Sequence, residues 1–544
     1  MEKRMCITVL LLLSLRVCAA QEETFRALDG LADVESLDAS QAEQYGHYLA
    51  HPLRINVLSR SRLLACGLFS RYQVATLLDW RENEGDILSA SELARIDGFG
   101  QAQAALLAPF LSFSSSRLPG QPVQKPSLRG ELTLRGAWRS GDGSGGGRLS
   151  LSREDRWEAG LAGRTVYGER LSWPPSGRSS FVALYRRRWR LVLGDYQVRF
   201  GQGLALWSGF SLSGVASPAA AIRRPSGLSV SRSYAGSGYR GLAADFEAGR
   251  WTFTLFGTRE GPVGGNVAWF GRFGQLSATA FRRPDGSGRA AVDARFCWDG
   301  TDYFAEVAKD LPSGKTAAVG GLILPVGDGG RLALMARHFP EGYVSRDAGA
   351  VRSGSKVSDE TGAAVAFSTL LLTASLDAAW HPSKRQGQVK LLSAGVLWQR
   401  GPWTWKYRLG GRYRMAEPRL RVDVCSDWLW QRGGWLLTGR TEASHSRKTG
   451  LLAYAEAGWK GTRGQAWLRA TAFRIDDWED RIYAYERNAP GYFSVPSYYG
   501  RGWEGAVYAG RKGRKWSIWL QASLLYRKDK PGRAGLKLQV QRNW

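Results

Sequence analysis

The chain has 544 residues, with 75 Lys and Arg against 48 Asp and Glu, and a formal net charge of +27. Three cysteines follow the first 20 residues, at positions 66, 297 and 425. An odd number at such wide spacing does not indicate a disulfide framework or a cysteine-based metal site, and favours three isolated small apolar residues. The strong positive balance would attract an anionic partner where the cations are accessible.

The first 20 residues predict a secretory signal peptide. Lys3 and Arg4 precede an apolar run over 5–15, and Cys-Ala-Ala at 18–20 forms a small-residue cleavage site. The run is shorter than the roughly 20 apolar residues that a membrane-spanning helix needs. We therefore expect an exported protein, with a flexible segment over 21–37.

Charge divides the mature chain into two parts. Residues 21–113 contain 7 Arg, no Lys and 13 acidic residues, a net charge of −6. Residues 114–544 contain 65 basic and 34 acidic residues, a net charge of +31. This asymmetry predicts an acidic domain over 38–112, a linker over 113–127 and a basic domain over 128–544.

Residues 38–112 have a helical pattern. Ser40 with Glu43, and Ser89 with Glu92, form Ser-x-x-Glu capping boxes. A Gly-Phe-Gly step at 98–100 separates two short helical stretches. With the middle helix over 72–81, this segment resembles the tandem helix-hairpin-helix domain of competence-type DNA receptors. The first hairpin departs from that pattern, because Cys-Gly-Leu-Phe-Ser stands at 66–70.

Two interpretations of the hairpin stay open. In the first, Gly98, Phe99, Gly100 and Gln101 hold a DNA phosphate, because glycine lets the backbone approach and the helix N-terminus attracts an anion. In the second, the helical domain is a packing or docking module. Duplex binding needs several cations, and the net charge of −6 and the glutamine at 101 favour the second interpretation.

From about residue 128 the apolar residues recur with a period of two. In 514–526, Trp516, Ile518, Leu520, Leu524 and Tyr526 share one face, with Trp519 as an exception. Such alternation predicts strands with one apolar and one polar face. Short glycine-rich turns between the segments, as at 326–330, favour antiparallel hairpins.

The strands suit a membrane barrel better than a soluble sandwich or propeller. Alternation over about 9–11 residues matches a tilted bilayer crossing. The chain has 23 Trp and 20 Tyr, many at strand ends, as in an interfacial girdle. The predicted fold is mainly β: a large antiparallel transmembrane barrel of about 22 strands, range 18–26, after a small all-α domain. Three longer loops are expected near 200–238, 338–360 and 476–498.

The chain ends in an alternating strand with Leu538, Val540 and the terminal Trp544 on one face. This end resembles the assembly signal of outer-membrane barrels in Gram-negative bacteria. The resemblance implies an outer-membrane location with the helical domain on the periplasmic side. It also implies outer-membrane lipid, lipopolysaccharide and the barrel assembly machinery as partners.

The stretch LGDYQVRFGQGLALWSGF at 193–210 extends the resemblance. It is similar to a signature in outer-membrane proteins that join a helix-hairpin-helix region to a large barrel. That resemblance implies an architecture and no activity. Glycines at 194, 201 and 203 indicate a strand that leads into a tight loop.

Three functions stay open from the sequence. The first is DNA handling or uptake across the outer membrane, with DNA as partner. The second is a plugged transporter or assembly scaffold, whose helical domain docks on protein, including other periplasmic proteins. The third is a structural barrel whose cations face lipopolysaccharide or solvent. No nucleophile stands with a base at readable spacing, and His47 and His51 lack a third metal ligand. We therefore expect no enzyme activity, metal site or cofactor.

Overall fold

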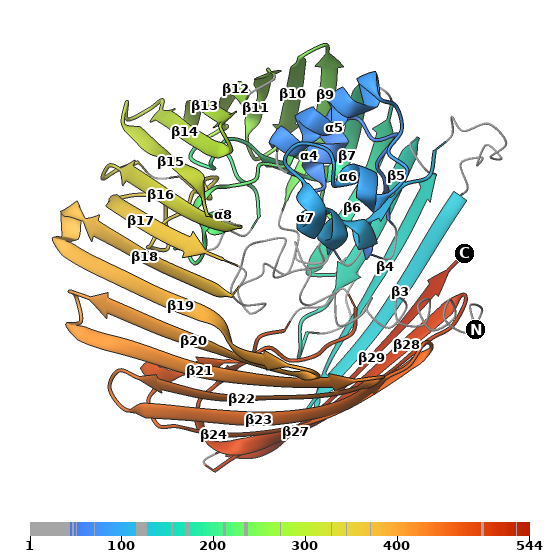
Figure 1. Ribbon diagram of the computed structural model, residues 1–544, viewed down its shortest axis with the longest axis vertical. Coiled ribbons are helices and arrows are strands. Elements are labelled where there is room, and N and C mark those ends of the chain that lie inside the picture. The colour runs from blue at the N-terminus through green and yellow to red at the C-terminus, as the bar shows by residue number, and fades with distance from the viewer. Residues whose placement is uncertain are drawn as a thin grey trace.

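The computed structural model describes most of the chain after residue 43 (Figure 1). The described residues are 44–45, 48–49, 52–69, 71–115, 128–153, 156–169, 175–186, 188–209, 214–232, 238–271, 274–327, 329–343, 345–369, 371–490, 494–528 and 530–544. The expected signal peptide, the segment 21–37, the first capping box and most of the linker lie outside them.

Twenty-four antiparallel strands form one closed barrel, and the ring is completed where the last strand pairs with the first. This confirms the predicted mainly-β antiparallel barrel, with slightly more strands than the expected 22. The barrel strands are β3 (Leu128–Arg139), β4 (Asp142–Arg153), β5 (Trp157–Arg164), β6 (Gly177–Tyr185), β7 (Trp189–Arg199), β9 (Tyr239–Ala248), β10 (Trp251–Thr258), β11 (Val263–Phe270), β12 (Gly274–Arg282), β13 (Gly288–Trp298), β14 (Thr301–Asp310), β15 (Thr316–Val326), β16 (Gly330–Phe339), β17 (Glu360–Ser368), β18 (Leu372–His381), β19 (Gln386–Arg400), β20 (Trp403–Arg414), β21 (Arg419–Arg432), β22 (Trp435–His445), β23 (Thr449–Lys460), β24 (Gly464–Ile475), β27 (Gly500–Lys512), β28 (Trp516–Arg527) and β29 (Lys530–Asn543).

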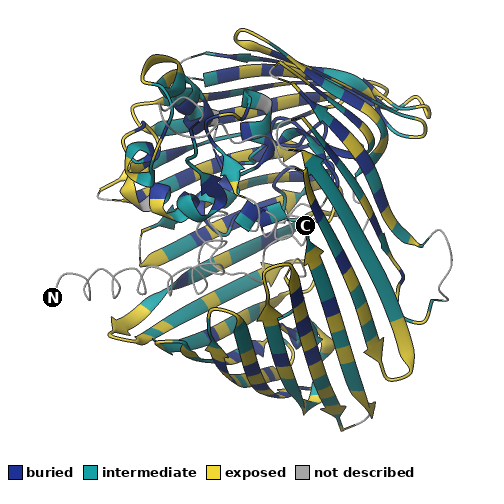
Figure 2. Ribbon diagram, turned by 90° about the vertical axis from the view of Figure 1, so that its right-hand side faces the viewer, coloured by how far each residue is buried: buried dark blue, intermediate teal, exposed yellow. Residues whose placement is uncertain are grey.

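The apolar face of the strands points out of the barrel. On β28, Trp516, Ile518 and Leu520 are 42–49% exposed, whereas Trp519 is 8% exposed on the inner side. Figure 2 shows the same alternation of exposed and buried residues along strand after strand. Because successive side chains of a strand point to opposite faces, the period-two pattern produces an apolar exterior and a polar interior.

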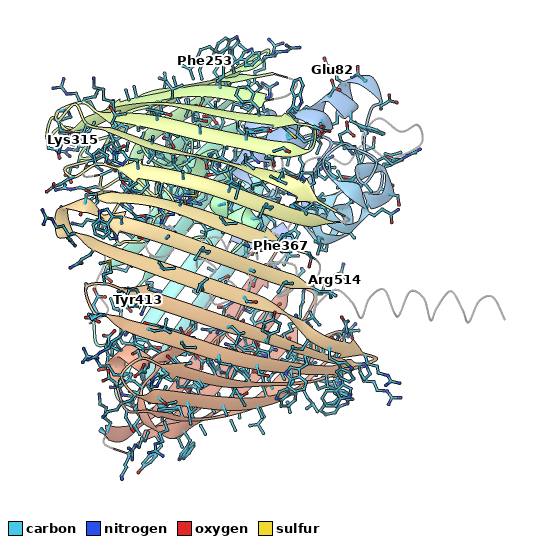
Figure 3. The ribbon with its side chains drawn as sticks, turned by 60° about the vertical axis from the view of Figure 1, so that its left-hand side comes forward. Glu82, Phe253, Lys315, Phe367, Tyr413 and Arg514 are labelled. Atoms are coloured by element: carbon cyan, nitrogen blue, oxygen red, sulfur yellow. The ribbon has the colours of Figure 1, made fainter. Side chains whose placement is uncertain are left out.

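The two ends of the barrel differ in their connections. The end that carries Leu128 and Asn543, here the terminal end, has short turns such as 249–250, 299–300 and 433–434. The opposite end, here the loop end, carries the connections 200–238, 340–359 and 476–499, close to the three expected loops. Figure 3 shows Arg514 at the terminal end, and Lys315 and Tyr413 at the loop end.

The height of the wall varies around the ring. Strands β5, β10 and β11 have 8 residues each. Strand β19 has 15 residues, and β21 and β29 have 14. The side formed by β5 to β12 is therefore lower than the opposite side.

A small helical region precedes the barrel and lies at its terminal end (Figure 3). It comprises α4 (Arg60–Ala65), α5 (Arg71–Asn83), α6 (Ala90–Leu93), α7 (Gly100–Leu107) and η2 (Ala108–Phe110), with β1 (Leu53–Arg54) paired in parallel with β2 (Leu111–Ser112). Its core includes Leu63, Leu77 and Phe110, all fully buried. No helix in the described part of the chain is long and apolar enough to cross a membrane.

The second predicted capping box is present in this helical region. The Ser89 hydroxyl accepts the backbone N–H of Glu92 at 3.2 Å. The Glu92 carboxylate in turn accepts the backbone N–H of Leu88 at 2.7 Å. The first bond satisfies an amide group that the first turn of α6 would otherwise leave open, and the second goes to the residue before the N-cap.

Candidate functional site

Three loops from the loop end fold into the lumen. We call them the first inward loop (200–238, with α8, Pro218–Ala221, and β8, Gly227–Val230), the second inward loop (340–359) and the third inward loop (476–499, with η4, Trp478–Asp480, β25, Ile482–Tyr483, and β26, Ser497–Tyr498). Leu204 and Tyr343 are fully buried in the largest hydrophobic cluster of the protein. The lumen is thus a packed interior over much of its wall.

Gly194 marks the point where β7 turns inward. β6 pairs with β7 only from Tyr185 and Arg190 up to Phe181 and Gly194. Beyond this point β7 pairs with β8 instead, from Tyr196 to Arg199. Gly194 has φ of +96°, and a Cβ there would lie 2.2 Å from the Ser180 carbonyl oxygen. Only glycine combines that backbone angle with so close an approach.

A carboxylate of the barrel wall holds the start of the first inward loop. Glu306 on β14 is 2% exposed and points inward. Its two oxygens accept the backbone N–H groups of Gln202, Leu204 and Ala205 at 2.5, 3.1 and 3.2 Å. Three backbone N–H groups of the loop thus converge on one buried side chain of the wall, so Glu306 anchors this loop.

Two further wall carboxylates hold the inward loops. Asp377 on β18 accepts the backbone N–H of Val215 at 3.2 Å. Glu360 at the start of β17 accepts the N–H groups of Ser353 and Gly354 from the second inward loop at 2.9–3.1 Å. Both carboxylates also receive the Arg337 guanidinium, at 2.6 and 2.5 Å. One arginine therefore joins two anchors.

The first and second inward loops also bond to each other. The backbone N–H of Trp207 donates to the Asp347 carbonyl at 2.6 Å, and the backbone N–H of Gly349 donates to the Gly203 carbonyl at 2.8 Å. The Tyr343 hydroxyl donates to the Leu204 carbonyl at 3.0 Å. The two loops form one assembly inside the barrel.

The third inward loop packs on the opposite wall. Arg487 pairs with Glu456 of β23 at 2.5 Å. Glu486 accepts the Gln521 amide of β28 at 2.6 Å and lies 3.7 Å from the Lys537 ammonium of β29. This loop is held by side chains of both charge signs.

Cations line the inner wall, and many of them face carboxylates. Arg190 pairs with Asp245, and Arg289 with Asp310 at 3.3 Å. Arg440 lies 2.6 Å from Asp427. The three arginines are each at most 5% exposed. Part of the positive charge of the barrel therefore lies inside it, which keeps the transport interpretations open and disfavours a barrel whose cations only face outward.

The helical region contacts the barrel through arginines of α4. The Arg60 guanidinium donates to the Gly249 carbonyl at 2.9 Å and lies 4.9 Å from the Phe270 ring centre. The Arg62 guanidinium lies 4.4 Å from the Tyr185 ring centre. Phe270 and Gly249 belong to the rim of the terminal end, so the helices sit at the mouth on the β5 to β13 side.

A cavity of about 160 Å³ lies between the helical region and the wall. Tyr48, Arg232 and Glu158 line it. Arg232 binds Glu158 at 2.6–2.9 Å. Burial raises the pKa of Tyr48, and the charge of Arg232 opposes that rise. The first inward loop and the helical region thus meet across this cavity.

The predicted hairpin residues form one turn. Gly98 and Gly100 have φ of +86° and +66°, both are exposed, and α7 begins at Gly100. Phe99 is 5% exposed and packs edge-on against Phe69 at 6.0 Å. Gln101 is exposed on the first turn of α7. A Cβ at Gly98 would lie 2.8 Å from the Tyr72 ring, whereas Gly100 faces open space.

The predicted C-terminal residues share the outer face of β29. Leu538 is 44% exposed and Trp544 is 47% exposed, while Val540 is half-buried. They lie more than 400 positions from the hairpin in sequence, at strand β29 and not in the helical region. The predicted hairpin residues and the predicted C-terminal residues therefore lie in different parts of the structure.

Sequence reasoning missed the loop anchors and the cations that surround them. Glu306 and Asp377 bind amides that lie 104 and 162 positions earlier in the chain, whereas Glu360 binds amides only six and seven positions earlier. The alternation did carry a signal, because an acidic residue on the polar face of a strand must point into the lumen. No group of three potential metal ligands occurs in the described part of the chain.

The fold defines a large closed barrel with an apolar exterior, a polar interior and inward loops. No family model matches the sequence. No curated protein matches it either.

Solved structures of outer-membrane barrels resemble it loosely. The translocation pore of the P pilus usher PapC is 12% identical, covers 77% of this chain and 99% of its own, and has a TM-score of 0.39. The siderophore receptor PirA from Pseudomonas aeruginosa is 10% identical, covers 78% and 81%, and has a TM-score of 0.39. OprD from the same organism is 10% identical, covers 77% and 95%, and has a TM-score of 0.32. Function must therefore be argued from the residues of this chain.

Proposed function

We propose that the protein is an outer-membrane transporter whose lumen is occupied by inward loops and whose periplasmic mouth carries the helical region. The observation that carries this proposal is the set of wall carboxylates, Glu306, Asp377 and Glu360, that bind loop amides. A barrel of 24 strands encloses far more space than side chains alone fill. Loops that occupy this space determine what passes.

The surface supports the membrane location. Large apolar side chains such as Leu255, Trp298 and Leu468 are 60–72% exposed on the outer face. A soluble protein rarely exposes so large an apolar belt. Lipid covers such a belt in a transmembrane barrel, and closure satisfies the backbone groups.

The connections support the orientation. Outer-membrane barrels have short turns on the periplasmic side and longer loops outside. By this rule the terminal end faces the periplasm, and the helical region with it. Its net charge of −6 over 21–113 complements the +31 of the remaining mature chain, so docking on the barrel is favoured over DNA binding.

Single-channel conductance in planar bilayers tests the proposal. Glu306→Gln with Asp377→Asn weakens two loop anchors, and we expect conductance and its noise to rise severalfold over the wild type. Asp299→Asn removes an exposed carboxylate from a turn at the terminal end and should leave conductance unchanged. A large, steady wild-type conductance that the double variant does not alter would contradict a loop-controlled lumen.

A second candidate, DNA handling by a helix-hairpin-helix domain, is favoured by the exposed hairpin. Gly100 and Gln101 present the N-terminus of α7 to solvent, and such an N-terminus attracts phosphate. Retention of labelled duplex by the full-length protein across a salt series tests it. Gln101→Glu should abolish salt-sensitive retention, and Gln101→Lys should increase it. Equal retention by both variants would refute a role for the hairpin.

A further inference from the structure

Two arginines of the first inward loop contact one tryptophan inside the lumen. Arg199 ends β7, and Arg223 follows α8. Their guanidinium carbons lie 5.5 and 5.6 Å from the ring centre of Trp207. The Arg199 Nε–H also donates to the Ser208 carbonyl at 2.9 Å, which fixes the side chain beside the ring. Trp207 thus gathers two positive charges that the sequence separates by 24 positions.

The second inward loop adds a third positive charge. Arg352 donates to the Ala350 carbonyl at 3.2 Å, and its carbonyl accepts the Gly214 N–H at 2.6 Å. Burial, together with the charges of Arg352 and Arg199, lowers the pKa of Arg223 to about 9. The three guanidinium groups are therefore close enough to repel one another.

A wall carboxylate that acts on Arg352 is already engaged. Burial lowers the pKa of Arg352, and the charge of Glu360 opposes this lowering only in part. Its oxygens, however, bind the Arg337 guanidinium and the N–H groups of Ser353 and Gly354. The charge of Glu360 is thus shared among several donors.

The tryptophan also supplies a donor without a partner. Trp207 is 7% exposed, and its indole N–H is buried without a hydrogen-bond partner among the described residues. A buried donor left unsatisfied costs about 1–3 kcal/mol. Arg223 and Arg352 are half-buried, so the cluster is still reached by solvent. An anion at this place would satisfy the indole and reduce the repulsion.

We propose that Arg199, Trp207, Arg223 and Arg352 form an anion-binding site in the lumen that takes a phosphate group. Guanidinium groups bind phosphate through paired N–H donors, and the indole N–H adds another. A role of this site in passage through the barrel rests on the proposed transporter function. Binding itself does not, and the test below measures binding.

Thermal unfolding of the purified full-length protein in detergent is the first measurement, with inorganic phosphate titrated against chloride at constant ionic strength. Phosphate should raise the midpoint, because a ligand that binds only the folded state stabilises it. Arg223→Gln should weaken phosphate binding roughly tenfold, and Trp207→Phe, which keeps a ring but loses the N–H, about threefold. Arg514→Gln, an exposed arginine at the terminal end (Figure 3), should change nothing.

A second readout separates a ligand site from a structural arginine. Without phosphate, Arg223→Gln should raise the unfolding temperature, because it removes a repelled charge. A lipopolysaccharide arm at equal phosphate concentration identifies the source: stabilisation by inorganic phosphate alone indicates a soluble ligand, and stabilisation by lipopolysaccharide alone indicates a lipid-borne phosphate. No specific stabilisation in either arm, or a lower unfolding temperature of Arg223→Gln in chloride, would overturn the proposal. Loss of phosphate binding with unchanged conductance would leave the transporter proposal standing.

Discussion

Trp544, the last residue, exchanges two backbone hydrogen bonds with Gly130, at 3.0 and 3.1 Å. These bonds continue the pairing of β29 with β3 by which the barrel closes. The indole also covers Gly130, because a Cβ at that glycine would lie 2.1 Å from the ring. The terminal aromatic residue is therefore part of the closing seam.

Gly130→Ala is expected to displace the Trp544 ring and to slow barrel closure. Assembled protein, measured as the fraction that migrates faster without heating in detergent electrophoresis, should fall severalfold. Deletion of Trp544 should have a similar effect. Gly136→Ala lies on the same strand and adds a methyl group into open space, so it should assemble normally. Equal assembly of all four proteins would contradict a role for this seam.

Gly194→Ala is expected to destabilise the barrel by more than about 2 kcal/mol, since it combines a positive φ with a clash against the Ser180 carbonyl. Gly286→Ala is a matched control, because Gly286 has φ of +82° and open space around it. Gly286→Ala should lower the free energy of unfolding by about 1 kcal/mol. Urea unfolding in detergent measures both. A smaller loss in Gly194→Ala than in Gly286→Ala would show that β7 does not need this sharp departure from the wall.

Docking of the helical region predicts a specific crosslink. Ala75 of α5 and the native Cys297 of β13 line one small cavity at the rim. Ala75→Cys should therefore be joined to Cys297 by a short thiol crosslinker in intact outer membranes. Glu82→Cys, on the outer side of the same helix (Figure 3), should not be joined, and Cys297→Ser should abolish the product. Equal crosslinking from both positions would mean that the helices move freely.

Cys66 is expected to be inert while the helical region is folded. Its thiol is 1% exposed and donates to the Leu63 carbonyl at 2.9 Å. Burial raises the pKa of this thiol from 9 to about 12, so it stays neutral at pH 8, and the thiolate is the reactive form. Alkylation at pH 8 should label Cys66 only after denaturation, as read by mass spectrometry. Rapid labelling of the native protein would contradict this burial.

The same shift sets a pH dependence of stability. The folded thiol holds its proton between pH 9 and about 12, where the unfolded thiol loses it. The contribution to stability is therefore complete below pH 9 and is lost as the pH rises toward 12. Cys66→Ala should remove this slope between pH 9 and 12 in thermal unfolding of the helical region.

The strands could be predicted because their signal is local. Trp516 and Ile518, assigned to the apolar face, are 49% and 48% exposed on the outer side. Ser517 and Gln521, at alternate positions of the same strand, are 5% and 4% exposed inside. A period of two fixes such faces without knowledge of any partner strand.

The lumen could not be predicted in the same way. Glu306 binds amides about 100 positions earlier in the chain, and Trp207 meets Asp347 across 140 positions. Such pairings depend on how the closed wall presents each strand, which no local pattern encodes. The hairpin at 98–100 was recognisable from its glycines, yet its position at the barrel mouth follows from Arg60 and Arg62, which carry no local signature.

The uneven wall has a consequence for the surrounding lipid. Strands of 8 residues, as in β10, rise roughly 20 Å along the barrel axis at a tilt of about 40°, and strands of 14 residues, as in β29, rise roughly 35 Å. The hydrophobic layer thus has to thin beside β5 to β12 and thicken beside β19 to β29, or the whole protein has to lean. Either response strains the bilayer on one flank. A second barrel that also thins the membrane would reduce this strain by approaching at the low side.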